Sequence, residues 1–86
     1  MRKERGLGYL TLLKGTAGKT YMICEIRLEE EVKRRLENLG MTQYTKVLLL
    51  NKKASGTAVI KVRGTRFAIG KKFAAGIAVE EVDDER

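Results

Sequence analysis

Apolar residues recur along this chain at two spacings, and each spacing predicts a different kind of element. The wider spacing, of four, four and three residues, marks one stripe of a helix: Leu28, Val32, Leu36 and Leu39. Three glutamates begin this segment, where carboxylates suit the positive end of the helix dipole. Gly40 can take the left-handed conformation that ends a helix. The pattern therefore predicts one α-helix over about residues 28–39.

The shorter spacing predicts strands, because apolar and β-branched residues alternate with polar ones between glycine-containing turns. The predicted strands cover residues 20–26, 45–51, 57–63, 66–69 and 76–82. Gly64-Thr65 is expected to join two of them as a hairpin. The first strand is largely apolar on both faces, so we expect it to be covered on both, with Cys24 as a buried packing residue.

One short helical turn is expected over about residues 71–75, with Phe73 and Ala74 pointing inward. Together the elements predict a mainly β domain, a small barrel of about five strands with one α-helix and this turn. Short strands joined by tight turns favour closure into a barrel, which removes exposed strand edges. At 86 residues the chain holds one domain. We expect a flexible leader at 1–8, the domain at 9–82 and an acidic tail at 83–86.

Charge is unevenly distributed along the chain. Residues 1–79 hold 17 Lys and Arg against 6 Asp and Glu, a charge of +11, while residues 80–86 carry −4, which gives the net +7. Such a basic body can bind anions or acidic protein surfaces, although it is equally consistent with solvated surface charge. A single cysteine and no export signal indicate a reducing, cytoplasmic location. No apolar run is long enough for direct membrane insertion.

The residue types that enzymes use most are missing. The chain has no histidine, so the usual general base and metal ligand are absent, and Cys24 has no histidine to activate it. We therefore expect no enzymatic activity, no cofactor and no metal site. A basic edge for nucleic acid remains an alternative, formed by Lys52, Lys53, Lys61, Arg63, Arg66, Lys71 and Lys72. Phe67 and Phe73 look like core residues, so the edge lacks stacking aromatics, which disfavours this alternative.

Several segments in order resemble one known family. They are Leu10–Gly15, Lys19–Ile26, Arg35–Met41, Val59–Ile69 and Ala74–Glu80. Together they resemble the ferrous iron transport protein A family over about residues 10–80. The chain departs from the family at two turns. The family often has a Pro-Gly pair before the strand that follows the helix, where this chain has Thr42–Thr45. In the later hairpin Thr57 follows Gly56 where a proline is often found.

The resemblance implies an SH3-like fold and a partner. Family members are thought to bind the cytoplasmic part of ferrous iron transport protein B, a membrane transporter with a GTP-binding domain, and to modulate transport. The same SH3-like module also occurs at the C-terminus of iron-dependent repressors. A metal-regulator domain and direct sensing of iron are therefore alternatives to the transporter-docking function. Homo-oligomerisation by strand pairing stays open. The candidate partner-binding residues are Arg34, Arg35, Tyr44, Lys52, Lys53, Arg63 and Arg66. For Tyr44, partial packing on the barrel end is the competing interpretation.

Overall fold

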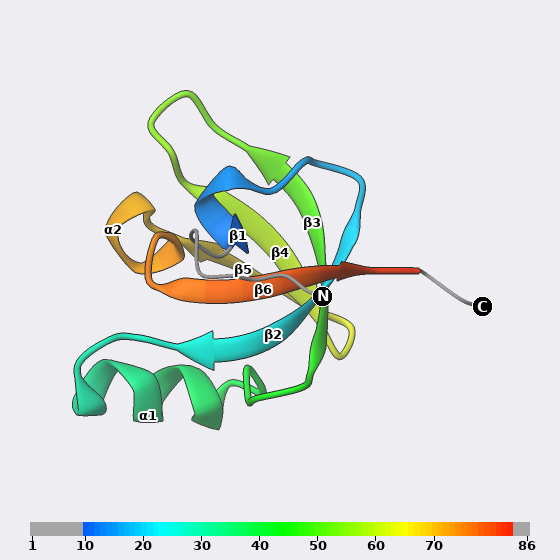
Figure 1. Ribbon diagram of the computed structural model, residues 1–86. Helices are drawn as coiled ribbons and strands as arrows, with labels where there is room; N and C mark the ends of the chain where they lie inside the picture. The colour runs from blue at the N-terminus through cyan, green and yellow to red at the C-terminus, as the bar shows by residue number, and fades with distance from the viewer. Residues whose placement is uncertain (1–9, 84–86) are drawn as a thin grey trace.

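The computed structural model describes residues 10–83 of the chain (Figure 1). In this part the elements are β1 (Leu10–Thr11), the 3₁₀ helix η1 (Leu12–Lys14), β2 (Thr20–Ile26), α1 (Glu30–Asn38), β3 (Lys46–Lys52), β4 (Ala58–Val62), β5 (Thr65–Ile69), α2 (Lys71–Ala74) and β6 (Ile77–Val82). The leader expected at 1–8 and most of the expected acidic tail lie outside the described residues.

The described strands form one antiparallel sheet in the order β1-β6-β2-β3-β4-β5. The sheet curls around a common core, and α1 lies beneath β2 in the view of Figure 1. The mainly β, SH3-like barrel predicted from the sequence is confirmed. The additional strand is β1, in which Leu10 pairs with Val79. Its two residues run directly into η1, so they show no alternation by which a strand could be recognised.

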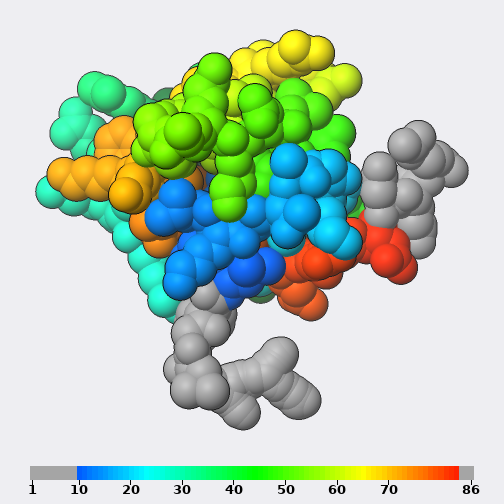
Figure 2. Space-filling view, turned by 90° about the horizontal axis from the view of Figure 1, so that it is seen from above, coloured from blue at the N-terminus to red at the C-terminus, as the bar shows by residue number. Residues whose placement is uncertain are grey.

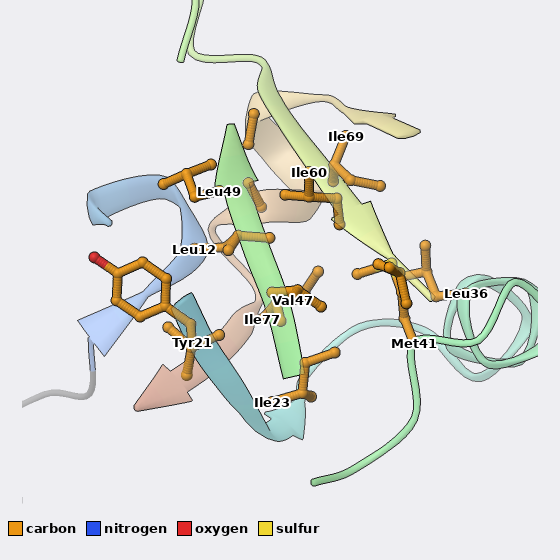
Figure 3. Close-up of a cluster of buried hydrophobic side chains, with 14 of the residues drawn as sticks. Leu12, Tyr21, Ile23, Leu36, Met41, Val47, Leu49, Ile60, Ile69 and Ile77 are labelled. Carbon is orange, nitrogen blue, oxygen red and sulfur yellow. The ribbon is translucent and has the colours of Figure 1, made fainter. Parts of the chain in front are cut away.

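Side chains from every side of the barrel meet in one hydrophobic cluster (Figure 3). The members that are at most 1% exposed include Leu12, Tyr21, Ile23, Val47, Leu49, Ile60 and Ile77. Burying each large aliphatic side chain stabilises the fold by about 1.5–3 kcal/mol. The hydroxyl of Tyr21 accepts a hydrogen bond from the backbone amide of Thr16 at 2.7 Å, so the buried phenol keeps a polar partner.

A β-bulge in β2 changes which side chains enter the core. The pairing of β2 with β6 shifts register between Ile23 and Glu25, which leaves Cys24 as the extra residue. Ile23 and Ile26 are consequently both buried although they are an odd number of residues apart. Cys24 is only half-buried, so the expectation of a fully packed cysteine was wrong. Sequence alternation alone does not locate a bulge, because one extra residue exchanges the two faces.

Helix α1 ends where Gly40 predicts. Gly40 has φ +103°, its amide donates to the Glu37 carbonyl at 3.0 Å, and the Met41 amide donates to the Leu36 carbonyl at 3.0 Å. This is a Schellman motif, and the buried Leu36 and Met41 supply the apolar contact that accompanies it (Figure 3). Leu39 was expected on the buried stripe but is 45% exposed, because it is the C-cap residue and lies past the last regular turn.

The short turn after β5 is present as α2. Ala74 is fully buried, as expected, but Phe73 is 39% exposed, so its predicted inward orientation was wrong. Neighbouring helical residues point in directions about 100° apart, and in this single turn Ala74 faces the core while Phe73 faces outward. Phe67 on β5 is half-buried and packs against the core cluster.

Candidate interaction surface

The described residues place no group of metal-ligating side chains around Cys24 or elsewhere. Within residues 10–83 no three or more His, Cys, Asp or Glu side chains gather so as to hold a metal ion. The Cys24 thiol lies 3.9 Å from Glu80 Oε1 and 3.8 Å from the Met22 carbonyl oxygen. Burial raises the pKa of the Cys24 thiol most, and the negative charge of Glu80 and the hydrogen bond between Cys24 and Glu80 raise it further. A raised pKa favours the protonated thiol, whereas a reactive cysteine nucleophile needs a lowered pKa.

Two of the candidate arginines are already paired along their own helix. Arg34 Nη2 lies 4.0 Å from Glu30 Oε2, and Arg35 Nη2 lies 3.8 Å from Glu31 Oε2. In each pair the glutamate precedes the arginine by four residues, which is the favourable order on a helix. All four side chains are well exposed, so each pair contributes only a few tenths of a kcal/mol, roughly 0.3–0.5. Their charge is partly compensated locally.

Tyr44 lies in the loop between α1 and β3 and is 67% exposed. Its backbone has φ +71°, the left-handed region that favours glycine. The Tyr44 amide donates to the Ile23 carbonyl at 2.6 Å, and Gln43 Nε2 donates to the Cys24 carbonyl at 3.0 Å. These bonds tie the loop to β2 at the bulge and leave the tyrosine ring projecting from the barrel. Partial packing on the barrel end, the competing interpretation, does not describe a side chain so exposed.

Lys52 and Lys53 lie at the other end of the molecule from the β4–β5 hairpin. Lys52 is the last residue of β3 and Lys53 begins the turn to β4, and antiparallel pairing places this turn and the β4–β5 turn at opposite ends of β4. Figure 2 shows the β3–β4 turn beside η1 and α2. Lys52 Nζ donates to the Gly15 carbonyl at 2.9 Å, which fastens this hairpin to the loop after η1. The seven candidate residues therefore do not form one surface.

The β4–β5 hairpin turns through Arg63 and Gly64. Their φ angles are +52° and +83°, and Val62 pairs with Thr65, so this is a two-residue turn with both central residues left-handed. The turn was expected one residue later, at Gly64-Thr65. The side chain of Arg63 crosses Gly40 at the end of α1: a Cβ added at Gly40 would lie 3.3 Å from Arg63 Cδ. Gly40 thus leaves room for the arginine.

Next to this turn the outer face of the sheet is hollowed into a shallow groove of about 220 Å³. It is lined by Thr20, Lys46, Val47, Leu48, Lys61, Arg63 and Gly64. Arg66 is the strand partner of Lys61, so it extends the same face onto β5. We call Lys46, Lys61, Arg63 and Arg66 the basic face. The sequence pointed to Arg63 and Arg66 as partner contacts and to Lys61 only as part of a nucleic-acid edge, and it did not point to Lys46. The alternation of outward Lys46 and Leu48 with inward Val47 and Leu49 is the signal that points to Lys46.

The fold and its surface define a small SH3-like barrel domain with a cationic outer face. A family model, described as the FeoA domain, matches residues 10–81. The chain therefore belongs to the FeoA family, a family of ferrous iron transport. No curated protein matches the chain.

Solved structures agree with this assignment of fold and family. The chain is 26% identical to an iron uptake regulatory protein (FeoA), with a TM-score of 0.76 over 88% of this chain and 100% of the other. It is 23% identical to FeoA from Chlorobium tepidum, with a TM-score of 0.80 over 90% and 74% of the two chains. The manganese regulator SloR contains a similar fold. It is 20% identical to this chain, with a TM-score of 0.75, and the match covers 86% of this chain and 35% of SloR.

Proposed function

We propose that this chain is a non-enzymatic accessory protein that docks on the cytoplasmic part of the membrane ferrous iron transporter and modulates ferrous iron uptake. The observation that carries the proposal is the FeoA domain match over residues 10–81. A structural relative at 26% identity is named an iron uptake regulatory protein, and the alignment spans the whole of that relative. FeoA proteins are non-catalytic accessory proteins, which agrees with the raised pKa of the Cys24 thiol and the lack of histidine.

A role beside a membrane transporter does not need a membrane segment in this chain. No helix among residues 10–83 is long and apolar enough to cross a bilayer. The transporter supplies the membrane-spanning part, and the domain described here supplies a docking surface in the cytoplasm. Exposed cations at such a surface accelerate encounter with an acidic partner more than they add to final affinity.

The direct test is a pull-down of the transporter's cytoplasmic GTP-binding domain by the immobilised chain. We expect capture at low salt that weakens but persists at moderate salt, since part of the interface is charged and part is not. An unrelated basic SH3-like domain of matched net charge serves as the control for charge alone. Equal capture by the control, or no capture at either salt concentration, argues against docking.

The second candidate function is that of a metal-regulator domain, which the structural likeness to SloR favours. That likeness covers 35% of the regulator, so it concerns one domain of a larger protein. Equilibrium dialysis with ferrous and manganous ions separates the two candidates. Stoichiometric binding of either ion to the isolated chain would favour the regulator interpretation, and its absence together with capture of the transporter domain would favour the accessory protein.

A further inference from the structure

Four cations without an ion pair among residues 10–83 lie together on the outer face of β3, β4 and β5 and the turn that joins β4 to β5. Lys61 and Arg66 are direct cross-strand partners, and like charges in that position destabilise a sheet. None of the four side chains of the basic face takes part in an ion pair within the described residues, in contrast to Lys19, Arg27, Arg34 and Arg35. The repulsion is therefore not relieved within the described part of the domain, and an anionic group from outside would relieve it.

The centre of this face is apolar. Leu48 is half-buried in the groove, with Thr20 and Lys61 as its strand partners on either side. An apolar floor edged by charged side chains is the arrangement of a protein–protein interface, where the centre excludes water and the rim stays polar. A groove of about 220 Å³ accepts one apolar side chain of a partner rather than a large ligand.

The same groove is poorly suited to nucleic acid. Sequence-tolerant single-strand binders combine cations with aromatic side chains on which the bases stack. None of the residues that line the groove is aromatic. The neighbouring Phe67 packs against the core, and Tyr21 is 1% exposed. The cations alone would hold phosphates, but Leu48 would then face a charged backbone without a partner.

We propose that the basic face is the surface through which this chain binds its partner, and that the partner presents carboxylates around one apolar side chain that enters the groove over Leu48. This inference rests on the proposed docking function and adds the location and chemistry of the contact. It replaces the scattered candidate residues with one contiguous set, and it assigns no part of the contact to Lys52, Lys53 or the paired arginines of α1.

Lys61→Glu is the sharpest variant, because it reverses the charge directly beside Leu48 and gives Arg66 a cross-strand partner of opposite sign, so the fold is expected to remain intact. The matched control is Lys72→Glu on α2, an exposed cation outside the groove that makes the same change in net charge. Circular dichroism of both variants verifies folding. Binding of the transporter's cytoplasmic GTP-binding domain is then measured by biolayer interferometry at low and moderate salt.

We expect Lys61→Glu to weaken binding by roughly tenfold or more at low salt, chiefly through slower association, and Lys72→Glu to stay within about twofold of the unmodified chain. Leu48→Gln should weaken binding at both salt concentrations, since it acts on the apolar centre. Equal losses of binding in the two lysine variants, or no loss in Lys61→Glu, would refute the basic face as the binding surface without refuting the proposed docking function. No binding by the unmodified chain would overturn the docking function and this inference together.

Fluorescence anisotropy with a labelled single-stranded oligonucleotide tests whether the basic face binds nucleic acid in place of an acidic protein. We expect weak binding that the two lysine variants reduce alike, as for any basic protein. Tight binding that only Lys61→Glu abolishes would make the groove a nucleic-acid site and refute an acidic protein partner.

Discussion

Replacing Gly76 with alanine tests the packing that fastens the β2–α1 connection to the barrel. Gly76 precedes β6, and a Cβ built on it would lie 2.4 Å from Leu28 Cδ2, 2.9 Å from Leu28 Cγ and 3.1 Å from the Arg27 carbonyl oxygen. The Gly76 carbonyl also accepts a hydrogen bond from the Arg27 amide at 2.7 Å. The methyl group therefore cannot be placed unless Leu28 moves out of its contact with the core or the two segments separate.

Overpacking of this kind costs about 1–3 kcal/mol, and weakening the amide–carbonyl bond adds about 0.5–1.5 kcal/mol. The lower entropy of the unfolded alanine chain offsets about 0.4–1 kcal/mol. We therefore expect Gly76→Ala to lower the free energy of unfolding by about 2 kcal/mol, which for a domain of this size lowers Tm by roughly 10 °C. Urea unfolding followed by far-UV circular dichroism measures the change.

Gly70→Ala is the matched control, because no atom lies within 4 Å of its added Cβ and its φ is −64°. It should be neutral or slightly stabilising. The double variant Gly76→Ala/Leu28→Ala should lose less stability than the sum of the two single losses, by a coupling of about 1 kcal/mol between residues in contact. If Gly76→Ala is as stable as Gly70→Ala, the close packing inferred between these segments is wrong.

Three further changes address the surface. Lys61→Glu should raise the free energy of unfolding by about 0.5 kcal/mol at low salt by pairing with Arg66, and the gain should vanish at high salt; a loss of stability would refute the cross-strand repulsion. Glu80→Gln should speed alkylation of Cys24 by iodoacetamide near pH 8, because the carboxylate raises the pKa of the thiol, and an unchanged pH profile would contradict this. Tyr44→Gly should raise the free energy of unfolding in urea by up to about 1 kcal/mol, because a backbone φ of +71° suits glycine better than tyrosine. Weaker binding of the transporter domain by this variant would identify the exposed Tyr44 ring as a contact.

The barrel could be predicted from the sequence because its core obeys simple periodicity. Buried Ala58, Ile60 and Val62 alternate along β4, and Gly40 ends α1 in the expected conformation. The prediction failed where one residue changes the phase: at the bulge beside Cys24, at Leu39 just past the end of the helix, and at the single turn that turns Phe73 outward. In each case the local pattern is compatible with two faces, and only tertiary contacts select one.

The candidate surface was less predictable, because it depends on register between strands. Arg63 and Arg66 could be named from their hairpin, but nothing local links them to Lys46, which is far from both in sequence. The pairing of Leu48 with Lys61 brings β3 beside this hairpin. Composition gives the number of cations but not their neighbours. It therefore cannot distinguish Arg34, which is paired with a glutamate on its own helix, from the cations of the basic face, which have no ion pair among the described residues.

The local features that work against stability are concentrated around the basic face and the loop next to it. Tyr44 and Arg63 hold left-handed backbone conformations that cost a non-glycine residue about 1–2 kcal/mol each, and Lys61 faces Arg66 across the sheet. A glycine or an opposite charge at these positions would suit the fold better. Among residues 10–83 no buried non-glycine residue has a positive φ. These unfavourable choices are consistent with the proposed docking of a partner on this side of the domain, because binding can offset a cost that folding alone does not.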